Sequence, residues 1–468
     1  MRWHLPAILL SAACGLLLGT TGCASGKSSQ PDTAAEKAYL DDQTLEAFDA
    51  DLKALSLAIE RGDTQSEGAL RTKIGEAARR HQKALVSALH DDDSTARRAI
   101  AGVLLGFTGD TAVVPALLGT VGNEEEPERV RLNALLGLDS LGEKLRDYKD
   151  HKALTNTLVE RMSAADASYN MRRAALQTYA TAFDGARQDS LVPIRDRFLS
   201  DPDIRVQMTA VTALGDIGDP IAVPDLTMVG LAHPEPEIRA ASAIALGKIA
   251  DPGRCIPALM DAAADENAGV RREAVDALSR HYGSNPEQVY AALVTGLADF
   301  DAQVREASAL ALARVREARA VEPLLQATGD RTAIVRQAAV ESLGLLIPGE
   351  REKDAYPLIE LLADQNPGVQ QATLTALANV TSSDFGNDQA RWRDYYWAKY
   401  PELDPANMYA GKPKPRMTSG ITNTGTRSTS RPATSSNRNT SRTNNNSNRN
   451  NSNRNQPNAR NNNARSGR

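Results

Sequence analysis

The chain has 468 residues, of which 41% are hydrophobic but only 4% aromatic, and its formal net charge is −5. Ala and Leu dominate the apolar residues, which argues against a β fold and favours closely packed helices, so we expect an all-α protein. The charge is uneven, because residues 411–468 contain 12 basic and no acidic residues, against 42 basic and 59 acidic residues before them. An acidic body therefore precedes a basic tail.

The first 22 residues have the composition of a secretory signal. One arginine precedes an apolar run that is too short to span a membrane, and small residues lead to Cys23. The stretch LLLGTTGC resembles a bacterial lipoprotein signal, and this resemblance implies acylation of Cys23 and, with Ala24 next, an anchor in the outer membrane. Thr20 stands where that family usually has Leu. Cleavage after Ala24, giving a soluble periplasmic or secreted protein, therefore remains an alternative.

Two helical patterns follow the signal. Residues 23–42 are polar and small, which predicts a flexible tether. Apolar residues then recur at helical spacing over about 43–61 and 64–90, and Thr64 and Glu67 have capping-box spacing. We predict a helical hairpin over 43–90 that caps the N-terminal end of the next segment.

A repeated unit occupies residues 91–382. Its marker is an apolar residue followed by Arg, and the marker positions are Arg97, Arg131, Arg172, Arg205, Arg239, Arg271, Arg305 and Arg336, with Gln370 in ninth place. The spacing is 31–34 residues except for one interval of 41. This period is typical of two-helix repeats, which bury their apolar faces only by stacking on neighbours. We therefore predict about nine stacked units.

Units such as DPDIRVQMTAVTALGDIGDPIAVPDL resemble HEAT repeats of the short bacterial type that is also found in phycobilin-lyase-like proteins. The resemblance implies an α-α superhelix, with Arg–Asp pairs such as Arg205 with Asp216 or Asp219 linking adjacent repeats. Four aspartates stand at expected helix N-caps: Asp201, Asp265, Asp299 and Asp364.

The second helices of HEAT-type arrays usually line the concave face, where partners dock. We expect four acidic residues there as a possible site for a basic or polar protein partner: Asp225, Asp261, Glu322 and Glu360. The alternative is a solvated acidic face that keeps the protein soluble.

An aromatic segment ends the array. Residues 383–401 place Trp392, Tyr396 and Tyr400 on one stripe of a helix for which Asp388 is the expected N-cap. We interpret this helix as a cap on the last repeat, with an aromatic ligand-binding patch as the alternative.

The remaining residues, 402–468, predict a disordered tail, since 411–468 contain 15 Asn and no aromatic residue. Nine arginines make the tail a candidate site for anionic envelope polymer, lipid or nucleic acid, without sequence specificity: Arg427, Arg431, Arg438, Arg442, Arg449, Arg454, Arg460, Arg465 and Arg468. The alternatives are an inert tail or one that folds back on the acidic body.

The sequence contains no visible catalytic motif. Its six histidines are scattered without metal-ligand spacing. The segment around Cys255 has no neighbouring His or acid, so we interpret this Cys as a small buried residue. We therefore predict a non-enzymatic, monomeric scaffold without cofactor or metal that binds other macromolecules in the cell envelope. The alternative is an envelope enzyme or lyase-like protein with a pocket in the helical array.

Overall fold

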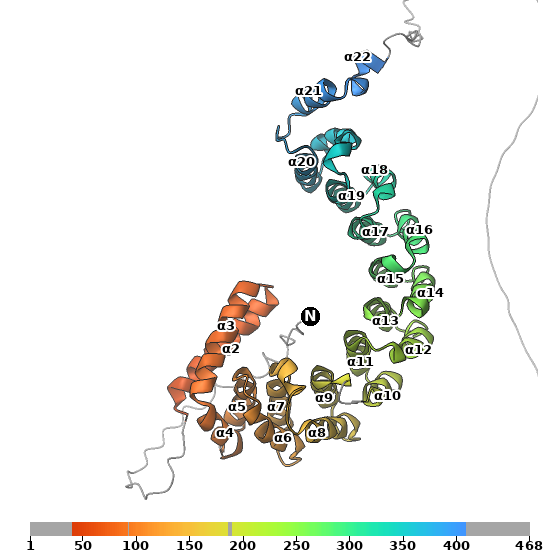
Figure 1. Ribbon diagram of the computed structural model, residues 1–468. Helices are drawn as coiled ribbons and strands as arrows, with labels where there is room; N and C mark the ends of the chain where they lie inside the picture. Colours follow the sequence, from red (N-terminus) through yellow and green to blue (C-terminus); the bar gives the residue numbers. More distant parts are fainter. Residues whose placement is uncertain (1–39, 92, 186–189, 409–468) are drawn as a thin grey trace, which may run out of the picture. The chain divides into compact units, whose positions relative to one another are not determined.

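A computed structural model describes residues 40–91, 93–185 and 190–408, and within these ranges every regular element is a helix (Figure 1). The expected all-α superhelix of paired helices is confirmed. The predictions for Cys23, the signal, most of the tether and residues 409–468 of the tail concern residues outside the described ranges.

The helices form two rows. The inner row consists of α5 (Thr95–Phe107), α7 (Glu128–Ser140), α9 (Tyr169–Ala182), α11 (Ile204–Ile217), α13 (Pro236–Lys248), α15 (Ala268–Arg280), α17 (Ala302–Val315), α19 (Ala333–Leu346) and α20 (Pro367–Thr381). The outer row consists of α4 (Gln82–Asp91), α6 (Val114–Gly122), α8 (His151–Ser163), α10 (Val192–Ser200), α12 (Val223–Asp225) with the π-helix η5 (Leu226–Gly230), α14 (Pro252–Ala262), α16 (Pro286–Gly296), α18 (Val321–Ala327) and the 3₁₀ segment η8 (Gly349–Ala363).

Neighbouring inner-row helices pack directly on one another, and from α11 to α20 they lie on the inside of the bend (Figure 1). Small residues permit this approach. A Cβ added at Gly215 of α11 would lie 2.6 Å from Cα of Ala245 in α13. Outer-row helices pack mainly on the inner helix that follows them in sequence. The structural repeat is therefore an outer helix followed by an inner helix. The repeat predicted from the sequence begins half a repeat later, with the inner helix.

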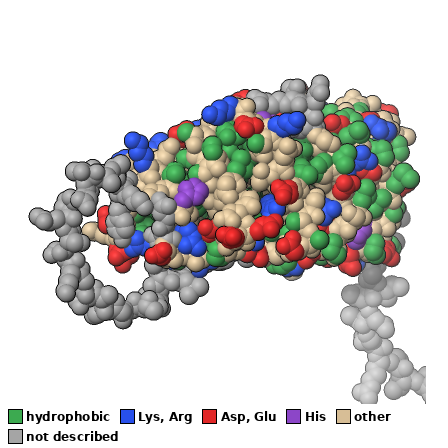
Figure 2. Space-filling model, turned by 90° about the horizontal axis from the view of Figure 1, so that it is seen from below, with side chains coloured by type: hydrophobic (Ala, Val, Ile, Leu, Met, Phe, Trp, Pro, Cys, Tyr) green, Lys and Arg blue, Asp and Glu red, His purple; other side chains and the backbone are tan. Residues whose placement is uncertain are grey.

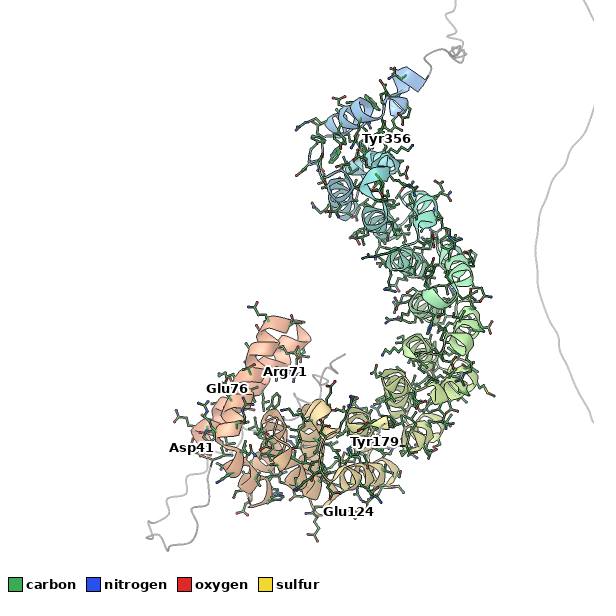
Figure 3. The ribbon with its side chains drawn as sticks, viewed as in Figure 1. Asp41, Arg71, Glu76, Glu124, Tyr179 and Tyr356 are labelled. Carbon is green, nitrogen blue, oxygen red and sulfur yellow. The ribbon has the colours of Figure 1, made fainter. Side chains whose placement is uncertain are left out.

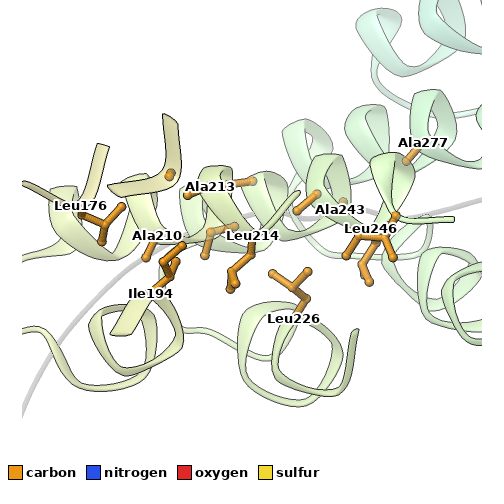
Figure 4. Packing of buried hydrophobic residues seen from close by; sticks show 14 of the residues in the cluster. Leu176, Ile194, Ala210, Ala213, Leu214, Leu226, Ala243, Leu246 and Ala277 are labelled. Carbon is orange, nitrogen blue, oxygen red and sulfur yellow. The ribbon is translucent and has the colours of Figure 1, made fainter. Parts of the chain in front are cut away.

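The core lies between the two rows. Leu214 and Leu246 of the inner row are fully buried and meet side chains such as Ile194 and Leu226 of the outer row (Figure 4). A fully buried leucine occupies the place of Leu214 in each inner helix from α11 to α20: Leu214, Leu246, Leu278, Leu312, Leu343 and Leu377. This one contiguous core is the reason that the units cannot fold singly.

Bidentate ion pairs connect successive inner helices. In each pair, which we call a fork, an Arg binds the Asp that precedes the next inner helix; the pairs are Arg172–Asp201, Arg239–Asp265, Arg271–Asp299, Arg305–Asp330 and Arg336–Asp364. The N–O distances are 2.7–2.9 Å. The same Asp accepts from the backbone N–H two residues later, for example from Asp301 to Asp299 at 2.8 Å.

The expected pairing of Arg205 with Asp216 or Asp219 is wrong. Arg205 instead binds Asp203, at the start of its own helix, and its guanidinium lies 3.4 Å from the ring centroid of Tyr169. The fork position of α11 is taken by Gln207, whose Nε2 donates to the carbonyl of Asp201 at 2.8 Å. The apolar–Arg marker falls two residues early in this helix, so the sequence ruler selected the wrong residue.

The expected N-caps are also displaced by two residues. The four predicted aspartates belong to forks, whereas the caps are Asp203, Asn267, Asp301 and Asn366. Both residues are polar in each pair, but only the second is close enough to the free N–H groups of the first turn.

The described part of the chain begins and ends with helices outside the two rows. At the N-terminal end these are α2 (Asp42–Glu60) and α3 (Thr64–Arg80). The predicted helix 64–90 is in fact two helices, α3 and α4, divided at His81. At the C-terminal end they are α21 (Gln389–Lys399), η9 (Pro401–Leu403) and α22 (Pro405–Met408). The short 3₁₀ turns are η1 (Thr111–Val113), η2 (Gly142–Leu145), η4 (Pro220–Ala222), η6 (Tyr282–Ser284) and η7 (Ala318–Ala320).

The aromatic helix α21 covers the last pair of helices. Asp388 caps it by accepting from two backbone N–H groups. Trp392 and Tyr396 are fully buried, and the Tyr396 hydroxyl donates to the carbonyl of Glu352 in η8 at 3.2 Å. Trp392 and Tyr396 therefore pack in the core and are not exposed to a ligand.

Candidate binding surfaces

The four acidic residues expected on the concave face lie instead on the outer row, in α12, α14, α18 and η8. The expectation failed because the unit begins with the outer helix, so the Arg-bearing helix is the one that lines the inside of the bend. Asp225 accepts from Arg195 of α10, and Glu360 accepts from Arg393 of α21 at 2.6 Å. Glu322 accepts from Gln326 at 3.2 Å, and Asp261 is exposed. Their role in partner binding stays a prediction.

A cavity of 1340 Å³ lies between α3 and the C-terminal ends of inner-row helices α7, α9 and α11. It exceeds the roughly 300–1,000 Å³ of sites that hold drug-sized ligands. Arg71 belongs to α3 and lines one side of it (Figure 3). Asp139, Lys144, Arg146 and Asp216 line its other sides. None of the described residues that line it is His or Cys. Reasoning from the sequence missed this cavity, because its walls come from segments that are far apart in the chain.

The charged groups of the cavity are largely bound by the protein itself. The backbone carbonyls at helix C-termini have no partner within their own helix. Lys144 donates to the carbonyl of Gly109 at 2.5 Å, and Arg146 donates to the carbonyl of Thr181 at 3.4 Å. Asp216 binds Lys248 at 2.6 Å. These cations therefore stabilise helix ends, which is a structural task.

Asp139 is a cavity residue whose carboxyl pKa is changed by its surroundings. Burial raises the pKa of its carboxyl, although the Thr181 hydroxyl donates to it at 2.6 Å and opposes that change. A carboxyl with a raised pKa can act as an acid or base. The lining also holds the exposed carboxyl of Glu143 but neither His nor Cys, so it offers Asp139 no imidazole or thiol as a catalytic partner.

The groups that could carry other chemistry are dispersed. Cys255 is fully buried, and burial raises the pKa of its thiol to about 11, so it is not a reactive thiolate. Within the described part of the chain, no three or more His, Cys, Asp or Glu side chains gather in a way that could hold a metal ion. No helix there combines the length and the apolar character needed to cross a membrane.

On the face shown in Figure 2, hydrophobic side chains lie among charged ones rather than in one broad patch. A stack of helix pairs with a continuous core, two exposed rows and bidentate links between repeats defines an α-solenoid.

Residues 155–231, 228–299 and 290–378 match the family model for HEAT repeats. The chain therefore contains HEAT repeats over residues 155–378. Among solved structures, yeast importin-beta (Kap95p) is 13% identical, with 76% of this chain and 54% of that chain covered and a TM-score of 0.49. A structure of Kap95p with RanGDP is 16% identical, with coverages of 71% and 49% and a TM-score of 0.47. The E. coli protein YIBA is 18% identical, with coverages of 57% and 92% and a TM-score of 0.38. The chain thus spans about half the length of Kap95p. No curated protein matches it.

Proposed function

We propose that this protein is a non-enzymatic scaffold that binds another macromolecule along its solenoid. The observation that carries the proposal is the continuous stack of nine helix pairs, which presents two long rows of exposed helix surface. Extended surfaces of this kind are the usual binding surfaces of repeat proteins. The cavity beside α3 is compatible with this proposal, because Lys144, Arg146 and Asp216 in its lining are bound by the protein itself.

The scaffold acts in the cell envelope. The lipoprotein-like signal supports export and acylation of Cys23, and Ala24 supports the outer membrane. Mass spectrometry of the mature N-terminus tests this directly. Acylated Cys23 is expected, with the lipid lost in Cys23→Ser. An unmodified N-terminus that begins after Ala24 would instead place the protein in solution in the periplasm or outside the cell.

The nine tail arginines add electrostatic attachment to anionic polymer, lipid or nucleic acid. Neutralising phosphates or sulfates releases counterions, so this binding weakens steeply with salt. The full chain and a variant with the nine arginines changed to Gln are compared on heparin resin. Elution of the natural chain at clearly higher salt supports the proposal, and identical elution contradicts it.

Partner binding by the solenoid is tested by capture. The tagged full chain is crosslinked in envelope extract, and crosslinked peptides locate the contact. A reproducible partner crosslinked to residues 82–381, and retained by the arginine-to-Gln tail variant, is the expected result. Crosslinks confined to the tail, or none, would remove the solenoid from the function.

A further inference from the structure

Exposed hydrophobic side chains single out one part of the outer row. The large hydrophobic residues that are exposed in the described part of the chain include five on that row or in the turn η4 that leads into it: Val192, Leu199, Ile221, Met228 and Val229. All five belong to α10 and to the adjoining stretch from η4 to η5. Met228 is 75% exposed and Ile221 55%. The other outer helices carry no large hydrophobic side chain that is exposed.

The repeat makes this comparison residue by residue. Each outer helix has a buried residue that faces the inner row, such as Ile194, Val223, Cys255, Val289 and Val321. The residue two before it is exposed, and it is Val192 in α10 and Ile221 before α12, but Gly253 in α14, Glu287 in α16 and Arg319 before α18. The residue five after it is exposed in α10, η5 and α18, as Leu199, Met228 and Gln326, whereas Met260 of α14 and Val294 of α16 pack against the core. Among these five outer helices, exposed apolar side chains at both places are therefore confined to α10 and α12–η5.

These side chains form a strip across two adjacent helices. Val192 and Leu199 are seven residues apart, which is two turns and about 10 Å along an α-helix. Ile221 and Met228 are also seven residues apart in sequence, across η4, α12 and η5. Between the two pairs, Arg195 of α10 donates to Asp225 of α12 and connects the helices side by side. We call the four hydrophobic residues, with Val229, the apolar strip.

The apolar strip lies at the one junction between α9 and α20 that lacks a fork. Gln207 and His233 stand where the other junctions have Arg and Asp. The outer helix there ends in the π-helix η5. The buried hydroxyls of Thr227 and Ser242 have no hydrogen-bond partner. π-Turns recur at functional sites, and local departures from a fold's rules are expected where function overrides stability.

The area of the apolar strip and the charges beside it indicate what kind of partner fits it. Five side chains expose on the order of a few hundred Å², well below the roughly 800 Å² per partner of a stable dimer. Two apolar pairs at two-turn spacing match the i, i+3, i+4 and i+7 anchors of one amphipathic helix. The charges beside the strip favour basic flanks, because Asp196 and Asp261 are exposed while Arg195 and Arg197 are bound to Asp225 and Asp201.

We propose that the apolar strip of α10 and α12–η5 is the docking site for a basic amphipathic helix of a partner protein. This proposal rests on the scaffold function and names the site and the kind of partner. It also places Asp225 and Asp261, which the sequence indicated as binding residues, at the centre and edge of one surface.

The probe is a fluorescein-labelled synthetic 16-residue peptide with Leu on one helical stripe and Lys elsewhere, titrated with the full chain by anisotropy. A peptide of the same composition in scrambled order is the control ligand. Saturable binding of the striped peptide, and at least about tenfold weaker binding of the scrambled one, is expected. Equal binding of both would overturn the proposal, because it would show attraction by charge alone.

Met228→Asp and Gln326→Asp form a matched pair, since both place an acid at the same position of an outer helix. Met228→Asp is expected to weaken binding of the striped peptide about tenfold, although the new carboxylate attracts lysine. Gln326→Asp is expected to leave binding of this peptide unchanged or to strengthen it. Unchanged melting of Met228→Asp excludes unfolding as the cause. Unchanged affinity of Met228→Asp would overturn the proposal, as would a homodimer, seen by sedimentation, that this variant dissociates. If a partner crosslinks elsewhere on the solenoid while the peptide fails, this site alone is wrong and the scaffold function stands.

Discussion

At the scale of single residues, the forks supply the directional contacts between repeats. Each combines a planar guanidinium with a carboxylate in bidentate geometry, which makes it stronger than an ordinary surface ion pair. The Arg305 side chain is only 5% exposed and Asp330 13%. Arg305 also donates to the carbonyls of Asp299 and Phe300, so one side chain satisfies groups of two successive repeats.

Arg305→Gln should lower the free energy of unfolding by about 2–3 kcal/mol, because it removes charge-assisted bonds and leaves Asp330 partly buried without its cation. Arg254→Gln is the control, since that Arg is 52% exposed in its pair with Asp251 and the loss should stay below about 1 kcal/mol. Urea denaturation followed by circular dichroism measures both. Equal losses would mean that the fork contributes no more than a surface pair.

The forks also predict a dependence of stability on pH. The bonds from Arg271, Arg305 and Arg336 lower the pKa of Asp299, Asp330 and Asp364 below the usual value. A carboxyl whose pKa is lower in the folded state contributes stability above its unfolded pKa, and this contribution is lost as pH falls through the folded value. Melting temperature should therefore hold from pH 7 to about 5 and fall below about 4. In the triple variant Asp299→Asn, Asp330→Asn, Asp364→Asn the acid decline should be shallower; an unchanged decline would assign it to other carboxyls.

At the scale of helices, the junction between α11 and α13 is the one to repair. Gln207→Arg with His233→Asp should rebuild the missing fork, since the carbonyl of Asp201 already accepts from the residue 207 side chain. Slower hydrogen exchange in α11 and α13 and a higher melting temperature are expected. Gln370→Arg is the control, because no Asp or Glu stands at the matching place after α20. A gain in both variants would show a general effect of adding Arg.

Helix spacing depends on glycine at the start of the array. A Cβ at Gly106 of α5 would overlap the carbonyl of Gly137 in α7, whereas one at Gly119 of α6 would meet nothing within 4 Å. Gly106→Val should therefore cost roughly 1–3 kcal/mol or more by forcing the helices apart. Gly119→Ala should be neutral or stabilise by up to about 1 kcal/mol, because alanine favours the helix. Thermal melting compares them, and tolerance of Gly106→Val would mean that α5 and α7 can separate freely.

The sequence predicted what repeats and missed what one repeat does differently. The period recurs over nine units, so it identified the all-α solenoid. Two separate errors followed. In α11 an Ile–Arg pair imitates the marker, so Arg205 was selected in place of Gln207. In four helices the Asp two residues before the true cap was taken for the cap, because both positions are polar. The cavity and the apolar strip depend on which helices become neighbours and which faces turn outward. That information belongs to the stacked structure, and the hydrophobic pattern of one helix does not contain it.

At the scale of the whole described array, stability is a sum over neighbouring interfaces, so a defect at one end should remain local. The C-terminal end tests this because α21 covers the last pair with two fully buried rings. Trp392 packs edge-on against Phe385 at 4.8 Å between ring centroids, and its Nε1 donates to the carbonyl of Gly386 at 2.9 Å. Removing this ring would leave a large void beside η8 and α20.

Trp392→Ala should cost about 3–5 kcal/mol at that interface, and hydrogen exchange should accelerate in η8, α20 and α21 while α5 to α9 keep their protection. The difference is expected because protection of the distant helices depends on their own neighbours. Phe300→Ala is the matched aromatic control, since Phe300 is 94% exposed and its loss should change exchange nowhere by more than about 0.5 kcal/mol. Acceleration spread evenly over the array in Trp392→Ala would show that the helix pairs unfold as one cooperative unit and would contradict the nearest-neighbour account.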